Sequence, residues 1–326
     1  MTAQPEGELI STDDNPIYAL AAPASFGQPG VACFAARRTG LVRSENGGQT
    51  WLDAYTSFLS GMLLATSSVA LSPEYEHDPI VFAGVHGGVV RSNDGGHTWR
   101  SAIFPPPAPI VVSLVISPNF GEDDSLFAGT AENGVFSSND GGATWSAWNF
   151  GLLDMNILCL AISPDFAKDE TLFAGTTTGL FSSTNGGRAW REVVLPVDLP
   201  AVLSLAVSPH YKDDRTVYAG TEEHGLFHSS VNKIRAGMPW EKLGQTSLTG
   251  PINAILLASD FPKPSELLVL HGSDLRYSPN RGETFHPWTR PGLPADFEVT
   301  AVAAPNGFSP GSPVLIGGDG GEVLIV

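Results

Sequence analysis

The sequence predicts an all-β protein: a seven-bladed β-propeller of four-stranded blades, with the ring closed by an N-terminal strand that completes the last blade. Three observations predict this fold. A glycine-rich turn motif recurs along the chain, a Ser-Pro motif precedes most copies of it, and both repeat through nearly all of the 326 residues. Seven units in this length give roughly 46 residues each, a period typical of four-stranded propeller blades. We therefore expect residues 1–326 to form a single domain.

The turn motif is a Ser, a short Asn/Asp-Gly-Gly turn and an aromatic residue at fixed spacing. Five copies keep this spacing, the last with Phe in place of Trp: LVRSENGGQTW (41–51), VVRSNDGGHTW (89–99), VFSSNDGGATW (135–145), LFSSTNGGRAW (180–190) and LRYSPNRGETF (275–285). A sixth copy, LFHSSVNKIRAGMPW (226–240), keeps its ends and has a longer middle. Repeats of this kind indicate one supersecondary unit used several times.

The second motif is Ser-Pro followed by an aromatic residue, an Asp and an apolar strand that ends in Ala-Gly. It reads, for example, ISPDFAKDETLFAG, and a short apolar strand lies before each Ser-Pro or its equivalent. Seven such strands are predicted, near residues 17–23, 67–73, 112–118, 158–164, 203–209, 252–259 and 299–305. They set the number of blades at seven.

Each unit then reads as strand A, the Ser-Pro loop, strand B, strand C, the turn motif and strand D. The last unit supplies only three strands before the chain stops at Val326. The segment GELISTD (7–13) precedes the first strand A and is predicted to complete this last blade. Such a closure removes the exposed edges of an open sheet.

The pattern resembles the Asp-box (BNR) repeat of β-propellers, Ser-x-Asp-x-Gly-x-Thr-Trp, over nearly the whole chain. Two copies match every position: Ser92, Asp94, Gly96, Thr98 and Trp99, and Ser138, Asp140, Gly142, Thr144 and Trp145. Elsewhere Asn46, Asn185 and Asn280 replace the Asp, and Ala189 replaces one Thr. In size and blade count the chain is closest to the photosystem II stability/assembly factor-like proteins of this family, and more distantly similar to sialidases.

The residues of the box predict a structural turn. Asp and Asn accept hydrogen bonds from nearby backbone N–H groups, Gly supplies positive φ, and Trp buries a large apolar face. A metal site would require the carboxylate, which Asn replaces in three of five copies. We therefore expect no metal at the boxes, and we predict no cofactor and no metal site for the chain as a whole. The resemblance further implies that the boxes lie on the C–D turns, so that function is sought on the opposite face, in the B–C and D–A loops.

Composition excludes several classes of partner. Seventeen basic against 34 acidic residues give a formal charge of -17, which disfavours nucleic acid and anionic lipid because both need clustered Lys and Arg. No apolar run is long enough to insert into a membrane. The first residues lack the regions of a signal peptide, so we expect a cytoplasmic protein, or an exported one if a leader has been removed.

Cys33 and Cys159 lie in apolar strands and are expected to be buried free thiols.

The B–C loops supply the polar candidates for a binding site. Blade 1 contributes the only Arg pair in the chain, and later blades contribute His and carboxylates. The predicted polar contacts are Arg37, Arg38, His86, Glu222, Glu223, His224, His271, Asp274 and Asp319. His224 and His271 with Glu222 and Asp274 could also form a metal or acid–base site, but no tight ligand spacing appears, so a chance gathering on an acidic face is the favoured interpretation.

The D–A loops are long and rich in Phe, Leu, Met and Pro, as in TSFLSGMLLATSS (56–68) and IFPPPAPIVV (103–112). Part of each loop packs the blade. The remainder either forms an apolar rim for a protein or peptide partner or plugs the mouth of the channel. Phe58 and Phe104 are the predicted apolar contacts.

Two functions remain in competition. Sialidases share the repeat, and the resemblance implies an arginine triad, a Tyr–Glu pair and an acid/base Asp; their Arg-Ile-Pro motif is absent here, and no Tyr is coupled by spacing to a Glu. Xyloglucan-cleaving enzymes with the repeat need a second propeller. We therefore predict a non-enzymatic interaction scaffold with no catalytic residues that binds a protein or peptide. The alternative is a glycoside hydrolase or lyase of sialidase-like type, with a carbohydrate ligand.

Overall fold

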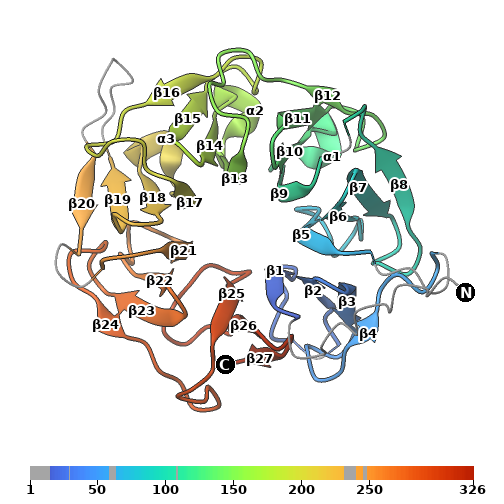
Figure 1. Ribbon diagram of the computed structural model, residues 1–326. Helices are drawn as coiled ribbons and strands as arrows, with labels where there is room; N and C mark the ends of the chain where they lie inside the picture. Colours follow the sequence, from blue (N-terminus) through green and yellow to red (C-terminus); the bar gives the residue numbers. More distant parts are fainter. Residues whose placement is uncertain (1–14, 29, 59–63, 108, 231–239, 245–247) are drawn as a thin grey trace, which may run out of the picture.

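The prediction of a seven-bladed propeller is confirmed. The computed structural model describes residues 15–28, 30–58, 64–107, 109–230, 240–244 and 248–326. Seven antiparallel sheets are arranged in a ring, each with its first strand innermost, around a central axis (Figure 1). Within each sheet the strands follow one another in chain order, so each blade is a meander.

The blades are numbered in chain order, and their strands are as follows. Blade 1 contains β1 (Ile17–Ala21), β2 (Cys33–Arg37), β3 (Gly40–Ser44) and β4 (Leu52–Asp53). Blade 2 contains β5 (Thr66–Leu71), β6 (Val81–Val85), β7 (Gly88–Ser92) and β8 (Arg100–Ile103). Blade 3 contains β9 (Val111–Ile116), β10 (Leu126–Thr130), β11 (Gly134–Ser138) and β12 (Ser146–Ala147). Blade 4 contains β13 (Ile157–Ile162), β14 (Leu172–Thr176), β15 (Leu180–Ser183) and β16 (Arg191–Val193).

The remaining blades continue the same order. Blade 5 contains β17 (Val202–Val207), β18 (Val217–Thr221), β19 (Leu226–Ser229) and β20 (Glu241–Leu243). Blade 6 contains β21 (Ile252–Leu257), β22 (Leu267–His271), β23 (Asp274–Ser278) and β24 (His286–Pro287). Blade 7 contains β25 (Val299–Ala303), β26 (Leu315–Gly318) and β27 (Val323–Ile325).

The ring closes between the first and the last blade. Strand β1 lies beside β25, where the Thr300 hydroxyl donates a hydrogen bond to the Ile17 carbonyl over 2.9 Å. Ile17 is fully buried and packs with Ala35, Val42 and Ala301 from the two blades. Among the described residues blade 7 has three strands. The segment predicted as its fourth strand, residues 7–13, lies outside the described residues, so that pairing stays a prediction.

Small polar side chains join several inner strands to the next blade. The Ser204 hydroxyl donates to the carbonyl of Ile252 over 2.6 Å, and the Ser67 hydroxyl donates in the same way to Val111. Cys159 takes this place in blade 4, where its sulfur lies 3.4 Å from the Val202 carbonyl oxygen. A polar bond between inner strands holds neighbouring blades where the sheets converge, and it accounts for Ser and Cys in strands that are otherwise apolar.

Both cysteines are free, as predicted. Burial raises the pKa of the Cys33 thiol to about 11 and that of Cys159 to about 12, so neither is a thiolate at neutral pH. Because the thiolate is the reactive form, we expect both thiols to react slowly with a disulfide reagent in the native protein. After unfolding in denaturant, two thiols per chain should react at once. A count of zero would show that the cysteines are paired.

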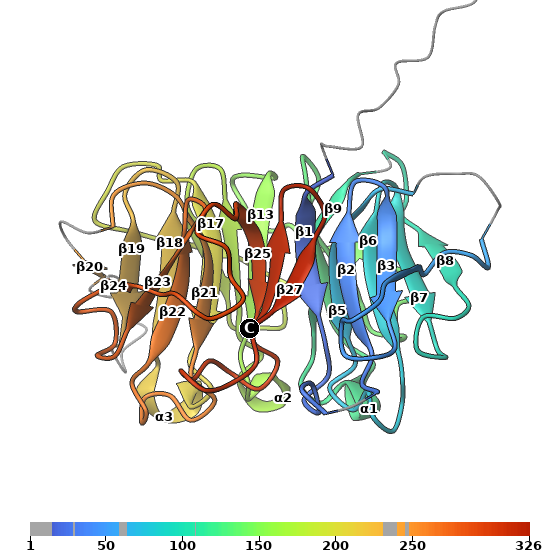
Figure 2. The ribbon, with the colours of Figure 1, turned by 90° about the horizontal axis from the view of Figure 1, so that it is seen from below.

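The Ser-Pro motif forms a staple between neighbouring blades. In blades 3, 4 and 5 it carries the short helices α1 (Phe120–Asp123), α2 (Phe166–Asp169) and α3 (Tyr211–Asp214), which lie together on one face of the ring (Figure 2). The aromatic residue of each helix is buried and meets, edge to face, an aromatic residue of the preceding blade at 5.5–6.0 Å between ring centroids. This packing explains the aromatic residue in the motif. No helix in the described ranges is long and apolar enough to span a membrane.

The box is a turn closed by its own side chains. The Ser138 hydroxyl donates to the Asp140 carboxylate over 2.7 Å and accepts from the Gly142 N–H over 2.9 Å. Thr144 donates to the same carboxylate through its N–H (2.9 Å) and its hydroxyl (2.5 Å). These Thr144 bonds, opposed by partial desolvation, hold the pKa of Asp140 below its usual value. Gly141 and Gly142 have φ of 66° and 84°, which favours glycine at both positions.

The boxes with Asn make the corresponding bonds. The hydroxyls of Ser44, Ser183 and Ser278 donate to the side-chain oxygens of Asn46, Asn185 and Asn280 over 2.9, 2.9 and 3.0 Å. Charge is therefore dispensable for this geometry, and the bonds support the interpretation of the box as a structural turn.

We expect Asp140→Asn to leave the free energy of unfolding within about 0.5 kcal/mol of the wild type at pH 7. The amide oxygen can accept from Ser138 and from the Thr144 N–H, and the amide NH2 can donate to the Thr144 hydroxyl, as Asn46 donates to Thr50 over 2.8 Å. Asp140→Ala should lower it by about 1–2 kcal/mol, since the Ser138 and Thr144 donors then lose their partner. Urea unfolding of the two variants in parallel measures both effects. A large loss in the Asn variant that added divalent cation restores would instead indicate a bound metal.

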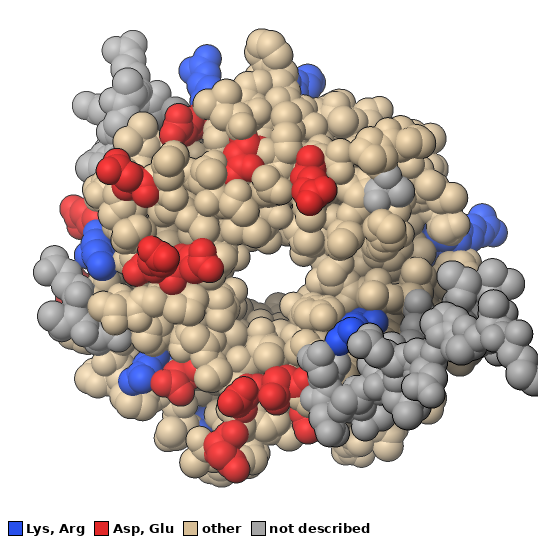
Figure 3. Space-filling model, viewed as in Figure 1, with Lys and Arg blue, Asp and Glu red and all other residues tan. Residues whose placement is uncertain are grey.

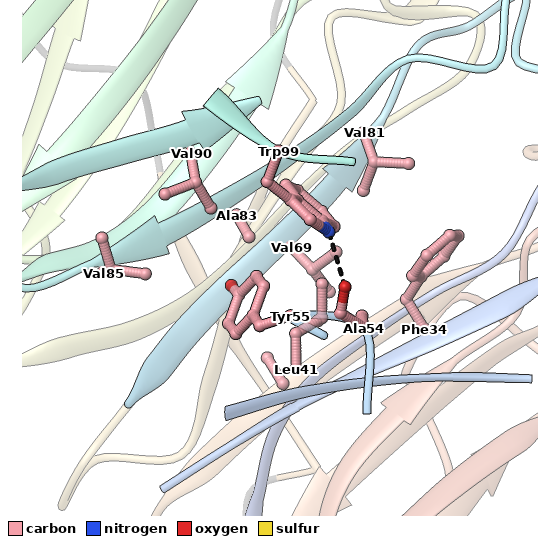
Figure 4. Close-up of a cluster of buried hydrophobic side chains, with 11 residues drawn as sticks. Phe34, Leu41, Ala54, Tyr55, Val69, Val81, Ala83, Val85, Val90 and Trp99 are labelled. Carbon is pink, nitrogen blue, oxygen red and sulfur yellow. Dashed lines mark hydrogen bonds between the residues drawn. The ribbon is translucent and has the colours of Figure 1, made fainter. Parts of the chain in front are cut away.

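The Trp of the box fills the space between blades. Trp99 is 7% exposed, and its indole N–H donates to the Ala54 carbonyl of blade 1 over 2.8 Å (Figure 4). It lies there among side chains of both blades, which include Tyr55 and Val69. The repeat therefore places one large aromatic side chain at a blade interface and fixes it with a hydrogen bond.

Candidate functional site: the B–C/D–A face

The topology separates the loops of the ring onto two faces. The A–B loops and the box turns share one face, which we call the box face: the Gly141 N–H donates to the Asp124 carbonyl over 3.0 Å, and the Gly186 N–H to the Glu170 carbonyl over 2.9 Å. The B–C and D–A loops lie on the other face, away from α1–α3 in Figure 2. We call it the B–C/D–A face; Figure 3 views it from the front.

Large exposed apolar side chains concentrate in three neighbouring D–A segments. Ten such residues occur among those described, and seven of them lie at the end of β8 or in the connections from blade 2 to 3, 3 to 4 and 4 to 5. We name these seven the apolar arc: Ile103, Ile110, Phe150, Leu153, Met155, Val194 and Leu199. Phe150 and Leu153 are 79% and 77% exposed. Such a concentration differs from the scattered single apolar residues of an ordinary surface.

The middle segment of the arc, residues 148–156, is fixed from both sides. The Asn149 side-chain oxygen accepts from the Val135 N–H over 2.8 Å, and its amide donates to the Asn133 carbonyl over 2.9 Å. The Phe150 carbonyl accepts from the Trp190 N–H of blade 4, and the Met155 carbonyl from Gly134, each over 2.8 Å. The exposed side chains are therefore presented by a backbone with defined bonds.

Asp154 is the anchor of this segment. Its carboxylate accepts from the hydroxyls of Thr177 (2.7 Å) and Thr178 (2.9 Å) in the B–C loop of blade 4, and from the Asn156 N–H (2.9 Å). Burial alone would raise the pKa of Asp154, but these bonds outweigh it and hold the pKa well below its ordinary range. Sequence reasoning missed this residue. The available signal was an Asp inside an apolar loop next to the Thr-rich loop GTTTG (175–179).

The arginines predicted in blade 1 lie at the end of β2. Arg38 is exposed and Arg37 is half-buried. Burial lowers the pKa of Arg37, against the opposing effect of the nearby Asp53 carboxylate. The Nε of Arg37 is buried without a hydrogen-bond partner among the described residues. The pair thus supplies a cationic spot on a face where carboxylates predominate (Figure 3).

The predicted histidines lie in separate environments. His86 is exposed in blade 2, and with Phe58, Leu64 and Ile103 it lines a mostly apolar hollow of about 260 Å³. His224 is half-buried, and a ring nitrogen of His271 is 2.9 Å from the Thr249 carbonyl oxygen.

The carboxylates do not join these histidines in a metal site. Asp274 pairs with Arg276 over 2.9 Å, while Glu222, Glu223 and Asp319 are exposed. Within the described ranges no group of three or more His, Cys, Asp or Glu side chains could hold a metal ion. The arrangement of His224, His271, Glu222 and Asp274 as one ligand set is therefore absent from the described structure.

Phe104 was wrongly predicted as an exposed contact. It is 1% exposed and stacks on Phe136 at 4.5 Å and near Trp145 at 5.0 Å, measured between ring centroids. Its neighbour Ile103, which is 78% exposed, takes the predicted surface position. Phe58 is half-buried and keeps part of its surface in the hollow beside His86.

A larger hollow, of about 750 Å³, opens on the box face. It lies between the A–B segments of blades 1, 2 and 7 and is lined by Ala21–Ala24, Leu71–His77 and Pro305. The carboxylate of Glu76 accepts a bond from the Ser25 N–H over 2.8 Å at this place. The sequence analysis did not predict this hollow.

Comparison with known proteins supports the fold. No protein-family model and no curated protein matches the sequence. Among solved structures, YCF48 from Cyanidioschyzon merolae is 13% identical with a TM-score of 0.67, over 96% of this chain and 95% of that one. YCF48 bound to a D1 peptide is 15% identical with a TM-score of 0.69, over 96% and 93%.

Longer proteins contain a similar ring. The GH74 enzyme of Niastella koreensis is 15% identical with a TM-score of 0.69, over 96% of this chain and 52% of that one. The extracellular domain of the hybrid two-component system BT4673 from B. thetaiotaomicron is 14% identical with a TM-score of 0.69, over 97% and 38%. This chain therefore spans about half or less of these two proteins. At such identities the likeness shows the seven-bladed fold.

Proposed function

We propose that this chain is a non-enzymatic interaction scaffold that binds a protein or peptide partner on its B–C/D–A face. The observation that carries the proposal is the apolar arc, which gathers in three adjacent D–A segments seven of the ten large exposed apolar side chains found among the described residues. Desolvated apolar side chains at the centre of a patch are what protein interfaces use for affinity. A surface of this kind has no evident role in packing the ring.

The comparisons favour a single ring that works by binding. The likeness to YCF48 extends over nearly the full length of both chains, and one of those structures holds a D1 peptide. The likeness to the GH74 enzyme covers about half of that protein. We therefore take peptide recognition as the first hypothesis and glycoside cleavage, with a carbohydrate ligand, as the second.

The proposal is tested by selecting displayed peptides on the immobilised protein. We expect peptides enriched on the wild type to bind the Phe150→Ser/Leu153→Ser variant about tenfold more weakly, because exposed apolar anchors dominate such contacts. Leu52→Ser is the matched control, since Leu52 is 62% exposed but lies outside the arc on β4. Binding to this control should equal that of the wild type.

The same experiment includes variants of the residues predicted from the sequence, Arg37→Ala/Arg38→Ala and His224→Ala/His271→Ala. Equal binding by all of them would remove these residues from the site. A selection that enriches no peptide would contradict the proposal. Turnover of a sialoside or another glycoside that is lost in His224→Ala and Asp274→Ala would establish the enzyme instead.

A further inference from the structure

We infer that the partner of the apolar arc is a cationic segment that carries bulky apolar side chains. The inference rests on the proposed function and specifies the chemistry of the ligand. Its basis is the charge of the loops that border the arc. These are the D–A segments 103–110, 148–156 and 194–201 and the B–C loops 84–88, 129–134, 175–179 and 220–225; together they contain five carboxylates and neither Lys nor Arg.

Four of the five carboxylates can face a partner. Asp154 is buried and occupied by Thr177, Thr178 and Asn156. The others, Glu132, Asp198, Glu222 and Glu223, are all exposed. Figure 3 shows acidic side chains spread around the central opening of this face, while most of the basic ones lie toward its outer edge. Together with a formal charge of -17, this field attracts cations and repels anions on approach.

The apolar part of the site is formed before a partner arrives. In segment 148–156, Leu152 is 5% exposed, and the chain on both sides of it is bonded through Asn149, Phe150, Asp154 and Met155. Phe150 and Leu153 point out of this fixed frame with more than three quarters of their surface exposed. Ordering the loop on binding then costs little, which favours a tight contact. The apolar side chains supply area, and the carboxylates beside them select the charge of the partner.

An anionic segment is the competing occupant. The cations predicted from the sequence for this face, Arg37 and Arg38, belong to blade 1 and lie outside the loops that border the arc. An anionic segment at the arc would lie near four carboxylates of the bordering loops, those of Glu132, Asp198, Glu222 and Glu223. These loops contain no Lys or Arg that could offset the repulsion. Like charges at an interface suppress binding, so the cationic segment is the better fit.

The test uses three labelled peptides of equal length: alternating Lys and Leu, alternating Lys and Ser, and alternating Glu and Leu. Fluorescence anisotropy with the full chain measures their affinities at low and at physiological salt. We expect the Lys-Leu peptide to bind at least about tenfold more tightly than either other peptide. Its affinity should fall with salt, because exposed charges are screened.

Two variants and their controls assign the binding to the arc. Phe150→Ser/Leu153→Ser should weaken the Lys-Leu peptide about tenfold at all salt concentrations, and Glu222→Lys/Glu223→Lys should weaken it mainly at low salt. The controls are Leu52→Ser and Glu283→Lys, which change an exposed Leu on β4 and an exposed Glu in a box turn. Both controls should bind as the wild type does.

The outcomes separate the two proposals. If the Glu-Leu peptide binds best and Arg37→Ala/Arg38→Ala abolishes its binding, this inference is wrong while the peptide-binding function stands. If the Lys-Leu peptide binds equally to the wild type, the arc variant and the controls, the contact is nonspecific and the inference is also wrong. If no peptide binds, here or in the display selection, the proposed function fails with it.

Discussion

Replacing Trp145 by alanine is expected to lower the free energy of unfolding by about 3–5 kcal/mol, as is usual for a large buried aromatic residue. Trp145 is 7% exposed and packs with Phe104 at 5.0 Å between ring centroids. Its indole N–H donates to the Gly142 carbonyl over 3.2 Å. Truncation therefore removes a buried ring, leaves a cavity beside blade 3 and deprives the turn of one bond. Equilibrium unfolding in urea measures the loss.

A box substitution should affect stability and leave binding unchanged. Thr144→Ala is the milder comparison, because Thr144 is exposed and its backbone N–H still donates to Asp140 after the hydroxyl is lost. We expect a loss of about 1 kcal/mol for it. At a temperature where both variants are folded, peptide affinity should match the wild type, since the boxes and the apolar arc lie on opposite faces. Loss of binding without loss of stability would mean that the binding face has been assigned wrongly.

The repeats made the architecture predictable. The Ser-Pro and box motifs recur because each fills a fixed position between blades, as the aromatic residues of α1–α3 and the box tryptophans do. Counting the strands before each Ser-Pro therefore counted the blades. Blade 7 lacks the box that precedes strand D in the other blades, so the repeat does not indicate which segment forms its outer strand. That residues 7–13 form this strand remains a prediction.

The binding face was less predictable because its residues do not repeat. Composition marked segment 103–112 as apolar, but whether Ile103 or Phe104 is exposed depends on which side chain reaches Phe136 of the next blade. Likewise, His224 and His271 occur in similar loops of adjacent blades. The fold places a ring nitrogen of His271 2.9 Å from the Thr249 carbonyl oxygen, a contact that the loop sequence does not indicate. Asp154 stood next to apolar residues in the sequence, and only the fold brings Thr177 and Thr178 to it.

Asp154→Ala is expected to lower the free energy of unfolding by about 2 kcal/mol at pH 7, because hydrogen bonds to a buried charged acceptor are lost and their donors are left without it. The Lys-Leu peptide should also bind more weakly, since segment 148–156 loses its bond to the B–C loop of blade 4. For the unfolding measurement, Asp198→Ala is the matched control: Asp198 is an exposed carboxylate in the next D–A segment. Its effect on unfolding should stay within about 0.5 kcal/mol.

The stability difference between the wild type and Asp154→Ala should depend on pH in one direction. The pKa of Asp154 in the folded protein is depressed, while the pKa of an Asp in the unfolded chain is about 3.9. Below that pH the unfolded chain takes up the proton first, so the stabilising effect is complete above about pH 5 and declines as the pH falls toward the folded pKa. Urea unfolding of both proteins from pH 7 to pH 3 measures this. A difference that stayed constant down to pH 3, or grew, would show that the carboxylate charge is not what holds the segment.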